Sequence, residues 1–411
     1  MLRKGEPKAA GSTGMGAPAL TWFVLLVLSH LVAALASAAF PNSALEKSMA
    51  LWPPSQPFSA YLQRVLINPI FRWDAIYFYQ PIAANGYQTT NGSLAYYPLL
   101  PYLARFLTLF GVDPFVGLWI VITLAGLGFV LLFERLARLD LPSEQANWVT
   151  QLLLIFPISL IIFIPYPEPL FLFLATASLY FMRRERWWLA GLMGFLATLA
   201  RQVGIFLVIP MVIELWIQGK ENRRWSWQAA RNWLAAGLIP LAMAGWTLFR
   251  IFAIEKVAPD TSSVQKFILT TLLSSKSSEV AVTRPFAWPW QVLAEAVTQA
   301  VQNPLIRLNV LFNMGGYFLV ALLLILAWKR LRLSYRIFSL VIVALSLLDF
   351  SFNLCALPIP SLFRHAYLAF PLFIGLPELF KNRWTRLAFV AFSLALFILL
   401  VYVYGVEGWV V

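Results

Sequence analysis

The sequence is poor in cysteine, histidine and charge, and each shortage excludes a class of site. Of 411 residues, one is cysteine, two are histidine and 12% are charged. The single Cys355 excludes an intramolecular disulfide framework and a cysteine-based metal site. His30 and His365 lie far apart and no HExxH motif occurs, so we expect no zinc site. The sequence also lacks the motifs of three common enzyme classes: GxxxxGK[ST] for nucleotide hydrolysis, GxGxxG for dinucleotide binding and GxSxG for serine hydrolases.

Apolar residues are abundant instead. Hydrophobic residues make up 60% of the chain, a share typical of multi-pass membrane proteins and too high for soluble domains. The net charge of +13 does not indicate nucleic-acid binding, because the basic residues form short clusters between apolar segments. We therefore predict an all-α polytopic membrane protein. It would have a disordered cytoplasmic N-terminus (residues 1–18), a single transmembrane domain (residues 19–405) and a tail (residues 406–411).

Eleven apolar segments are candidates for transmembrane helices. They lie near residues 19–40, 114–133, 146–165, 167–182, 187–200, 203–217, 232–254, 305–328, 335–357, 366–380 and 385–405. The first contains Ala36-Ser37-Ala38, which resembles a signal-peptidase site, but its roughly 20 residues can span a bilayer and we expect a retained helix. The stretch 98–110 is proline-rich, carries Arg105 and is shorter than the roughly 17 residues of a span. We expect it to be a short amphipathic helix at the membrane surface.

The basic clusters predict the orientation of these segments. With the N-terminus in the cytoplasm and residues 98–110 outside, most of the basic residues fall in short cytoplasmic segments, as the positive-inside rule requires. Two long loops, about 41–113 and 255–304, then face the non-cytoplasmic side. Loops of this length are usually functional. The second contains an aromatic and proline-rich stretch, residues 284–290, that is typical of a membrane interface.

Polar residues that are costly to bury gather at the outer side of this predicted topology. The stretch 72–101 is too broken by proline and glycine to span a bilayer, yet it carries an acid among aromatic residues. Polar side chains from four separate segments form the candidate site: Asp74 and Tyr77, Glu168, Arg201 with Gln202, and Arg364 with His365. A helix bundle assembles a site in this way, from a few polar groups over an apolar wall.

Each candidate also has a simpler structural interpretation. Asp74 can pair with Arg72 at the membrane surface, and Glu168, between two prolines, can favour a helix N-terminus. Arg201 and Arg364 can extend to the headgroups. Tyr77, Tyr96 and Tyr97 can anchor the chain at the membrane interface. Asp349 can be the buried ion-pair partner of a basic residue, and His30 can have a structural role. A carboxylate near guanidinium groups also suits a reaction in which arginine holds an anionic lipid-linked donor and an acid deprotonates an acceptor hydroxyl.

The motifs resemble a known family. The run WDAIYFYQPIAANGY followed by AYYPLLP resembles the signature of the PIG-V type mannosyltransferases, which belong to the GT-C class of membrane glycosyltransferases. Three later pieces are similar to the family in the same order: FPISLIIFIPYPEPLFLFLA, TLARQVGIFLV and SLFRHAYLAFPLF. The similarity extends from about residue 71 to 375. The chain departs from the family at Pro167, where serine is usual, and at His365, where tyrosine is common.

The resemblance implies a GT-C-like fold and a sugar transfer. Such enzymes use a polyprenyl- or dolichyl-phosphate sugar at a site facing away from the cytoplasm, with an acid of the first outer loop as general base. Carried onto this sequence, Asp74 is that base, and Arg364 and Arg201 neutralise the leaving phosphate. The other expected substrate contacts are Arg72, Trp73, Tyr77, Tyr97, Glu168, Gln202 and His365. We expect no metal-ligating residues and no cofactor, since the lipid-phosphate sugar is a co-substrate, and the dependence on a divalent metal stays open.

The acceptor, the sugar and the oligomeric state stay open at this point. The partners implied are a polyprenyl-phosphate sugar, a lipid or glycolipid acceptor and the membrane, which is the plasma membrane in a bacterium or the endoplasmic reticulum in a eukaryote. One rival is transfer of a different sugar by the same mechanism. Another is a transporter or flippase of lipid-linked sugars, which predicts inverted repeats and polar residues at mid-bilayer.

Overall fold

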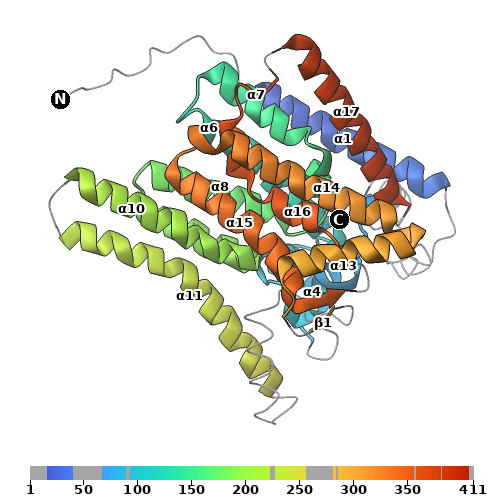
Figure 1. Ribbon diagram of the computed structural model, residues 1–411. Coiled ribbons are helices and arrows are strands. Elements are labelled where there is room, and N and C mark those ends of the chain that lie inside the picture. The colour runs from blue at the N-terminus through green and yellow to red at the C-terminus, as the bar shows by residue number, and fades with distance from the viewer. Residues whose placement is uncertain are drawn as a thin grey trace.

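The chain folds into a bundle of helices (Figure 1). The computed structural model describes residues 16–39, 67–88, 93–222, 227–255, 281–283, 286–355, 358–380 and 382–406. Its longer helices are α1 (Gly16–Ala39), α5 (Leu99–Thr108), α6 (Pro114–Ala137), α7 (Ser143–Leu154), α8 (Glu168–Arg183), α9 (Trp187–Ala200), α10 (Val208–Asn222), α11 (Trp227–Glu255), α13 (Pro289–Gln302), α14 (Pro304–Ala327), α15 (Leu333–Phe352) and α17 (Arg383–Gly405).

Short helical turns and one pair of strands complete the described elements. The turns are η2 (Asn68–Ile70), η3 (Ala75–Tyr79), α4 (Gln80–Asn85), η4 (Ser93–Ala95), η5 (Pro157–Ile162), η6 (Gln202–Leu207), η7 (Trp328–Arg330), α16 (Leu362–Tyr367) and η8 (Phe370–Gly375). The strands β1 (Ala281–Thr283) and β2 (Asn353–Cys355) pair antiparallel, with Ala281 opposite Cys355. The predicted helical class is confirmed, with this short ladder as an addition that the sequence did not predict.

Seven helical stretches within the described residues are long and apolar enough to cross a membrane. They are Gly16–Ala39, Pro114–Ala137, Gln202–Gly219, Arg231–Ala253, Ile306–Arg330, Leu333–Phe350 and Arg383–Gly405. The multi-pass membrane architecture is therefore confirmed, whereas the count of eleven is not. Helices α7, α8 and α9 have 12, 16 and 14 residues, which is short for a span. The first helix begins at Gly16, inside the segment predicted as disordered, while residues 1–15 and 407–411 lie outside the described part.

Two of the predicted spans are broken at prolines. In the stretch 146–165, α7 ends at Leu154 and Pro157 opens the 3₁₀ turn η5; in the stretch 366–380, α16 ends at Tyr367 and η8 follows. Broken backbone at membrane depth must find other hydrogen-bond partners. The Tyr367 hydroxyl donates to the Leu153 carbonyl at 2.8 Å, and the Ser159 hydroxyl donates to the Leu154 carbonyl at 2.5 Å. These side chains satisfy carbonyls at the end of α7, and both broken stretches are buried inside the bundle.

The helices α8 and α9 form an antiparallel hairpin that sets up the site. α9 approaches α11 very closely, since a Cβ on Gly191 would lie 2.2 Å from the Ala235 carbonyl oxygen. Small residues of this kind let helix backbones pack together in membranes. Because α8 begins at Glu168 and α9 ends just before Arg201, the hairpin brings these two residues to the same end of the bundle.

The opposite end of the bundle carries a second set of charges. Arg183, in the last turn of α8, pairs with Asp140 at 2.6 Å and donates to the Tyr335 hydroxyl at 3.0 Å. Arg332 pairs with Glu214 at 2.6 Å. Arg183 and Arg332 are among the basic residues predicted to be cytoplasmic. Arg183 lies at the other end of α8 from Glu168, about 20 Å away at 1.5 Å per residue.

The long predicted loops hold helices of their own. The stretch 98–110 forms α5, a ten-residue amphipathic helix that is too short to span a bilayer. In the second loop, α13 packs against α14 and α15, and the exposed rings of Trp288 and Trp290 stack at its start with centroids 4.9 Å apart. Stacked, exposed tryptophans suit a membrane interface.

Candidate active site

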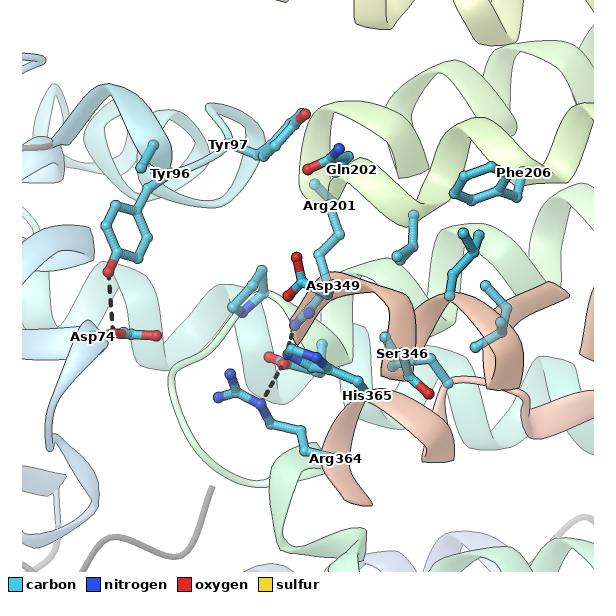
Figure 2. A pocket seen from close by; sticks show the side chains of 18 of the residues that line it. Asp74, Tyr96, Tyr97, Arg201, Gln202, Phe206, Ser346, Asp349, Arg364 and His365 are labelled. Atoms are coloured by element: carbon cyan, nitrogen blue, oxygen red, sulfur yellow. Dashed lines mark hydrogen bonds and ion pairs between the residues drawn. The ribbon is translucent and has the colours of Figure 1, made fainter. Parts of the chain in front are cut away.

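Five segments of the chain meet around one cavity of about 310 Å³ (Figure 2). Its polar lining consists of Asp74, Tyr79, Tyr96, Tyr97, Glu168, Arg201, Gln202, Ser346, Asp349, Arg364 and His365. Seven of the predicted site residues therefore line the same cavity: Asp74, Tyr97, Glu168, Arg201, Gln202, Arg364 and His365. The rest of the wall is largely apolar, with side chains such as Phe206, Ile342 and Leu368.

Asp74 lies at one side of the cavity, at the start of the π-helical turn η3. The preceding Trp73 has a φ of 50°, a left-handed conformation that costs a non-glycine residue about 1–3 kcal/mol. Such strain and π turns both occur often at functional sites. The Tyr96 hydroxyl donates to Asp74 Oδ1 at 3.2 Å. Burial, together with the Asp74 charge, raises the pKa of Tyr96, so this hydroxyl stays a donor at physiological pH.

A buried carboxylate holds two arginines in the middle of the cavity. Glu168 is fully buried in the first turn of α8 and forms an ion pair with Arg201 Nη1. Its Oε1 also lies 3.4 Å from Arg364 Nε. The Arg364 guanidinium stands over the Tyr166 ring, 5.1 Å from the centroid. Removing one partner of a buried ion pair costs about 3–5 kcal/mol, so Glu168 fixes both guanidinium groups in place.

The backbone around Arg201 explains why it points into the cavity. Arg201 is extended, with φ −151° and ψ 142°, between the end of α9 and the 3₁₀ turn η6. The turn folds back on α9 so tightly that a Cβ on Gly204 would lie 2.4 Å from the Thr198 backbone nitrogen. Only glycine allows this approach. The sequence ARQVG thus encodes the reversal that presents Arg201 and Gln202.

Arg364 and His365 are presented by the one-and-a-half-turn helix α16. Ser361, immediately before α16, has a φ of 63°. The Asn313 side chain of α14 accepts a hydrogen bond from the Phe363 backbone nitrogen at 3.2 Å. The His365 ring stacks against Phe350 of α15, with centroids 6.3 Å apart. α16 is thereby fastened to both neighbouring helices.

Three predicted site residues do not line this cavity: Arg72, Trp73 and Tyr77. Arg72 is 1% exposed and donates to the backbone carbonyls of Asn68, Phe71 and Gly405. It fastens the loop that carries Asp74. Tyr77 is 53% exposed and does not join Asp74 in the cavity lining, where an α-helical spacing was expected to bring it. The structure therefore gives these three residues no place in the cavity wall.

The cavity also contains residues that were not singled out as site residues from the sequence. Asp349, in the last turn of α15, was considered only as an ion-pair partner, and Tyr96 only as a membrane anchor. Ser346 lies one helical turn before Asp349. An acid inside an otherwise apolar span is the signal that could have identified Asp349. Within the part of the chain described, no group of three histidine, cysteine, aspartate or glutamate side chains could hold a metal ion.

Comparison of the chain with known proteins gives partial structural similarities. The apo structure of ArnT from Cupriavidus metallidurans matches with a TM-score of 0.46 and 15% identity, over 89% of this chain and 77% of that one. The Archaeoglobus fulgidus oligosaccharyltransferase tethered with an acceptor peptide matches with a TM-score of 0.40 and 13% identity, over 94% of this chain and 55% of that one. The chain thus spans about half the length of that oligosaccharyltransferase. No curated protein sequence matches the chain.

The sequence model of the family described as mannosyltransferase (PIG-V) matches residues 19–218. This range includes Asp74, Glu168 and Arg201, and it confirms the resemblance that the motifs indicated. Over residues 19–218, just under half of its length, the chain is thus similar to the PIG-V type mannosyltransferases.

Proposed function

We propose that the protein transfers a sugar, most simply mannose, from a polyprenyl- or dolichyl-phosphate donor to a hydroxyl of a lipid-linked or other acceptor on the non-cytoplasmic face of the membrane. The observation that carries this proposal is the cavity itself. It brings the carboxylate of Asp74 together with the guanidinium groups of Arg201 and Arg364, from three distant parts of the chain. The family match to mannosyltransferases supports the choice of sugar.

The proposed reaction is a single displacement. Asp74 takes the proton of the acceptor hydroxyl, and the acceptor oxygen attacks the anomeric carbon. The bond between that carbon and the phosphate oxygen breaks, its electron pair stays on the lipid phosphate, and the configuration at the anomeric carbon inverts. The hydrogen bond from Tyr96 fixes the orientation of Asp74 and leaves its second oxygen for the acceptor.

Two arginines suit the phosphate of such a donor. The guanidinium group offers several donors in one plane, and its contacts with phosphate oxygens are charge-assisted. Arg364 is 4% exposed and Arg201 lies at the cavity wall, so both would act in a poorly hydrated site where electrostatic stabilisation is strong. Glu168 neutralises part of their charge before the donor binds and keeps them together.

The test is transfer by the purified Asp74→Asn variant. The protein is incubated with polyprenyl-phosphate mannose, and with other polyprenyl-phosphate sugars, together with lipid acceptors, and the products are identified by mass spectrometry. Loss of a general base lowers rates by about 10²–10⁴-fold, so we expect transfer by the variant to fall by that factor. Asparagine keeps the shape of aspartate, and we expect an unchanged elution profile in gel filtration.

Asp113→Asn is the matched control. Asp113 caps α6, accepts a hydrogen bond from the Phe115 nitrogen at 2.8 Å and lies outside the cavity lining. Asparagine caps helices as well as aspartate, so this variant should keep full activity. Full transfer by Asp74→Asn would exclude Asp74 as the base. Movement of intact donor across a vesicle membrane without product would instead indicate a transporter.

A further inference from the structure

One wall of the cavity has polar groups that the proposed chemistry does not use. α15 contributes Ser346 and Asp349 among the apolar residues Ile342 and Leu345, and α16 contributes His365. Asp349 is the third carboxylate of the lining, after Asp74 and Glu168. A carboxylate in the last turn of a helix faces the negative end of the helix dipole. In a membrane span it also carries a large desolvation cost, and ionisable residues in such positions usually mark a functional site.

The direction of the proposed displacement indicates which part of the donor lies against α15 and α16. The attacking oxygen lies near Asp74 and the departing phosphate near Arg201 and Arg364. The anomeric carbon must therefore lie between them, with the sugar ring projecting to the side of that line. Figure 2 shows Asp349 and His365 across the gap from Asp74, beside the two arginines. If the sugar ring projects from this line toward α15, its hydroxyl groups meet Asp349 and His365.

We infer that Asp349, assisted by Ser346 and His365, binds hydroxyl groups of the donor sugar and so determines which sugar is transferred. This inference rests on the proposed function. A carboxylate accepts hydrogen bonds and offers two oxygens, which suits neighbouring hydroxyls of a pyranose. A site built to hydrogen-bond a substrate hydroxyl strongly rejects an analogue that lacks it, because the buried polar group is then left unpaired. The ligand class is a hexopyranose attached to a lipid phosphate.

The experiment compares the wild type with Asp349→Asn on polyprenyl-phosphate mannose and on its 2-, 3-, 4- and 6-deoxy analogues. Asparagine weakens a charge-assisted hydrogen bond, and we expect kcat/KM for the complete sugar to fall about 10- to 100-fold. For each deoxy analogue that lacks a contacted hydroxyl, the ratio of the wild-type rate to the variant rate should fall below its value for the complete sugar, toward one. For the other analogues, the ratio of the wild-type rate to the variant rate should equal the ratio measured with the complete sugar.

Two further variants keep the comparison independent of folding. Asp349→Ala removes both oxygens and should lose more activity than Asp349→Asn, with the same dependence on the contacted hydroxyls. Asp113→Asn makes the same chemical change outside the cavity. With every donor, the ratio of the wild-type kcat/KM to the variant kcat/KM should stay at one. Gel filtration and thermal unfolding of each variant in detergent show whether it is folded.

The outcomes separate the sugar contact from the proposed reaction. An equal loss with every donor, deoxy analogues included, would mean that Asp349 acts by placing Arg201 or the fold, and this would overturn the inference alone. Unchanged rates with all donors would overturn it as well. Failure of the wild type to transfer any polyprenyl-phosphate sugar would overturn the proposed function, and the sugar contact with it.

Discussion

At the scale of the residue, Glu168 is the most consequential side chain of the cavity apart from Asp74. It is fully buried and contacts both Arg201 and Arg364. The sequence suggested either a substrate contact or a helix N-terminal residue. The structure places it in the first turn of α8 and in the cavity lining, with its carboxylate against two guanidinium groups, which suits a residue that positions them for a third, anionic partner.

Arg364→Ala should weaken donor binding more than Arg364→Lys. Lysine keeps a positive charge for the phosphate and for Glu168 but lacks the planar set of donors. We expect the dissociation constant of the donor to rise by about 10-fold for lysine and about 100-fold or more for alanine, in line with charge-assisted hydrogen bonds. Titration of the purified variants with polyprenyl-phosphate mannose measures both values.

Arg105→Ala serves as the control for this pair, since the Arg105 guanidinium donates to the Ala84 carbonyl at 3.2 Å outside the cavity lining. Equal donor affinities for Arg364→Ala and Arg364→Lys would contradict a phosphate contact and favour the simpler interpretation of Arg364 as a residue that extends to the headgroups.

The residues of the site were predictable to different degrees. Asp74, Arg201 and Arg364 stood out because charges are rare in this chain and lie beside aromatic or proline-rich motifs. Asp349 did not, because its neighbours in the cavity come from other segments of the chain. Arg72 was misplaced because its contact with the Gly405 carbonyl spans 333 residues, which local sequence does not reveal.

At the scale of the element, the turn between α9 and η6 determines where Arg201 lies. Hydrophobic periodicity predicted the helices before and after this turn but not its sharpness, which depends on the close approach at Gly204. The predicted spans at 146–165 and 366–380 are broken for a related reason. Their apolar composition suits a helix, but their prolines remove backbone donors and end it.

Gly204→Ala should destabilise the protein and displace Arg201. The added methyl group would meet the backbone of Thr198 and Ala197, neither of which can move aside like a flexible side chain. Overpacking of this kind costs about 1–3 kcal/mol. We expect a lower midpoint of thermal unfolding in detergent and weaker donor binding. Gly219→Ala is the control, because nothing lies within 4 Å of its added Cβ. Equal midpoints for the two variants would show that the turn has room to relax.

At the scale of the whole molecule, the charges are divided between two ends of the bundle. Asp74, Glu168 and Arg364 meet at one end, and the ion pairs of Arg183 and Arg332 lie at the other. The positive-inside pattern predicted this division, because it depends on the order of segments rather than on their contacts. The short helices α7 to α9 were counted as spans from composition alone, and their number was the least predictable part of the fold.

The orientation of the bundle can be tested with reporter fusions. A reporter inserted after Leu139, between α6 and α7, should register as cytoplasmic, since the basic residues Arg135 and Arg138 precede it. A reporter after Val112, between α5 and α6, should register as external. An external signal after Leu139 would reverse the topology and make residues 98–110 a span, despite the ten-residue length of α5.

The contact between Arg72 and Gly405 has a consequence for biosynthesis. The Arg72 guanidinium donates to the Gly405 carbonyl at 3.0 Å, and the Tyr404 hydroxyl donates to the Ile70 carbonyl at 3.2 Å. A ribosome makes all the cavity segments, from Asp74 to His365, before it makes the end of α17. The nascent chain can therefore insert every helix of the candidate site and still lack the anchor of the loop that carries Asp74. That anchor is completed only when α17 docks beside α1 (Figure 1), so the candidate site depends on a helix that contributes no residue to its lining.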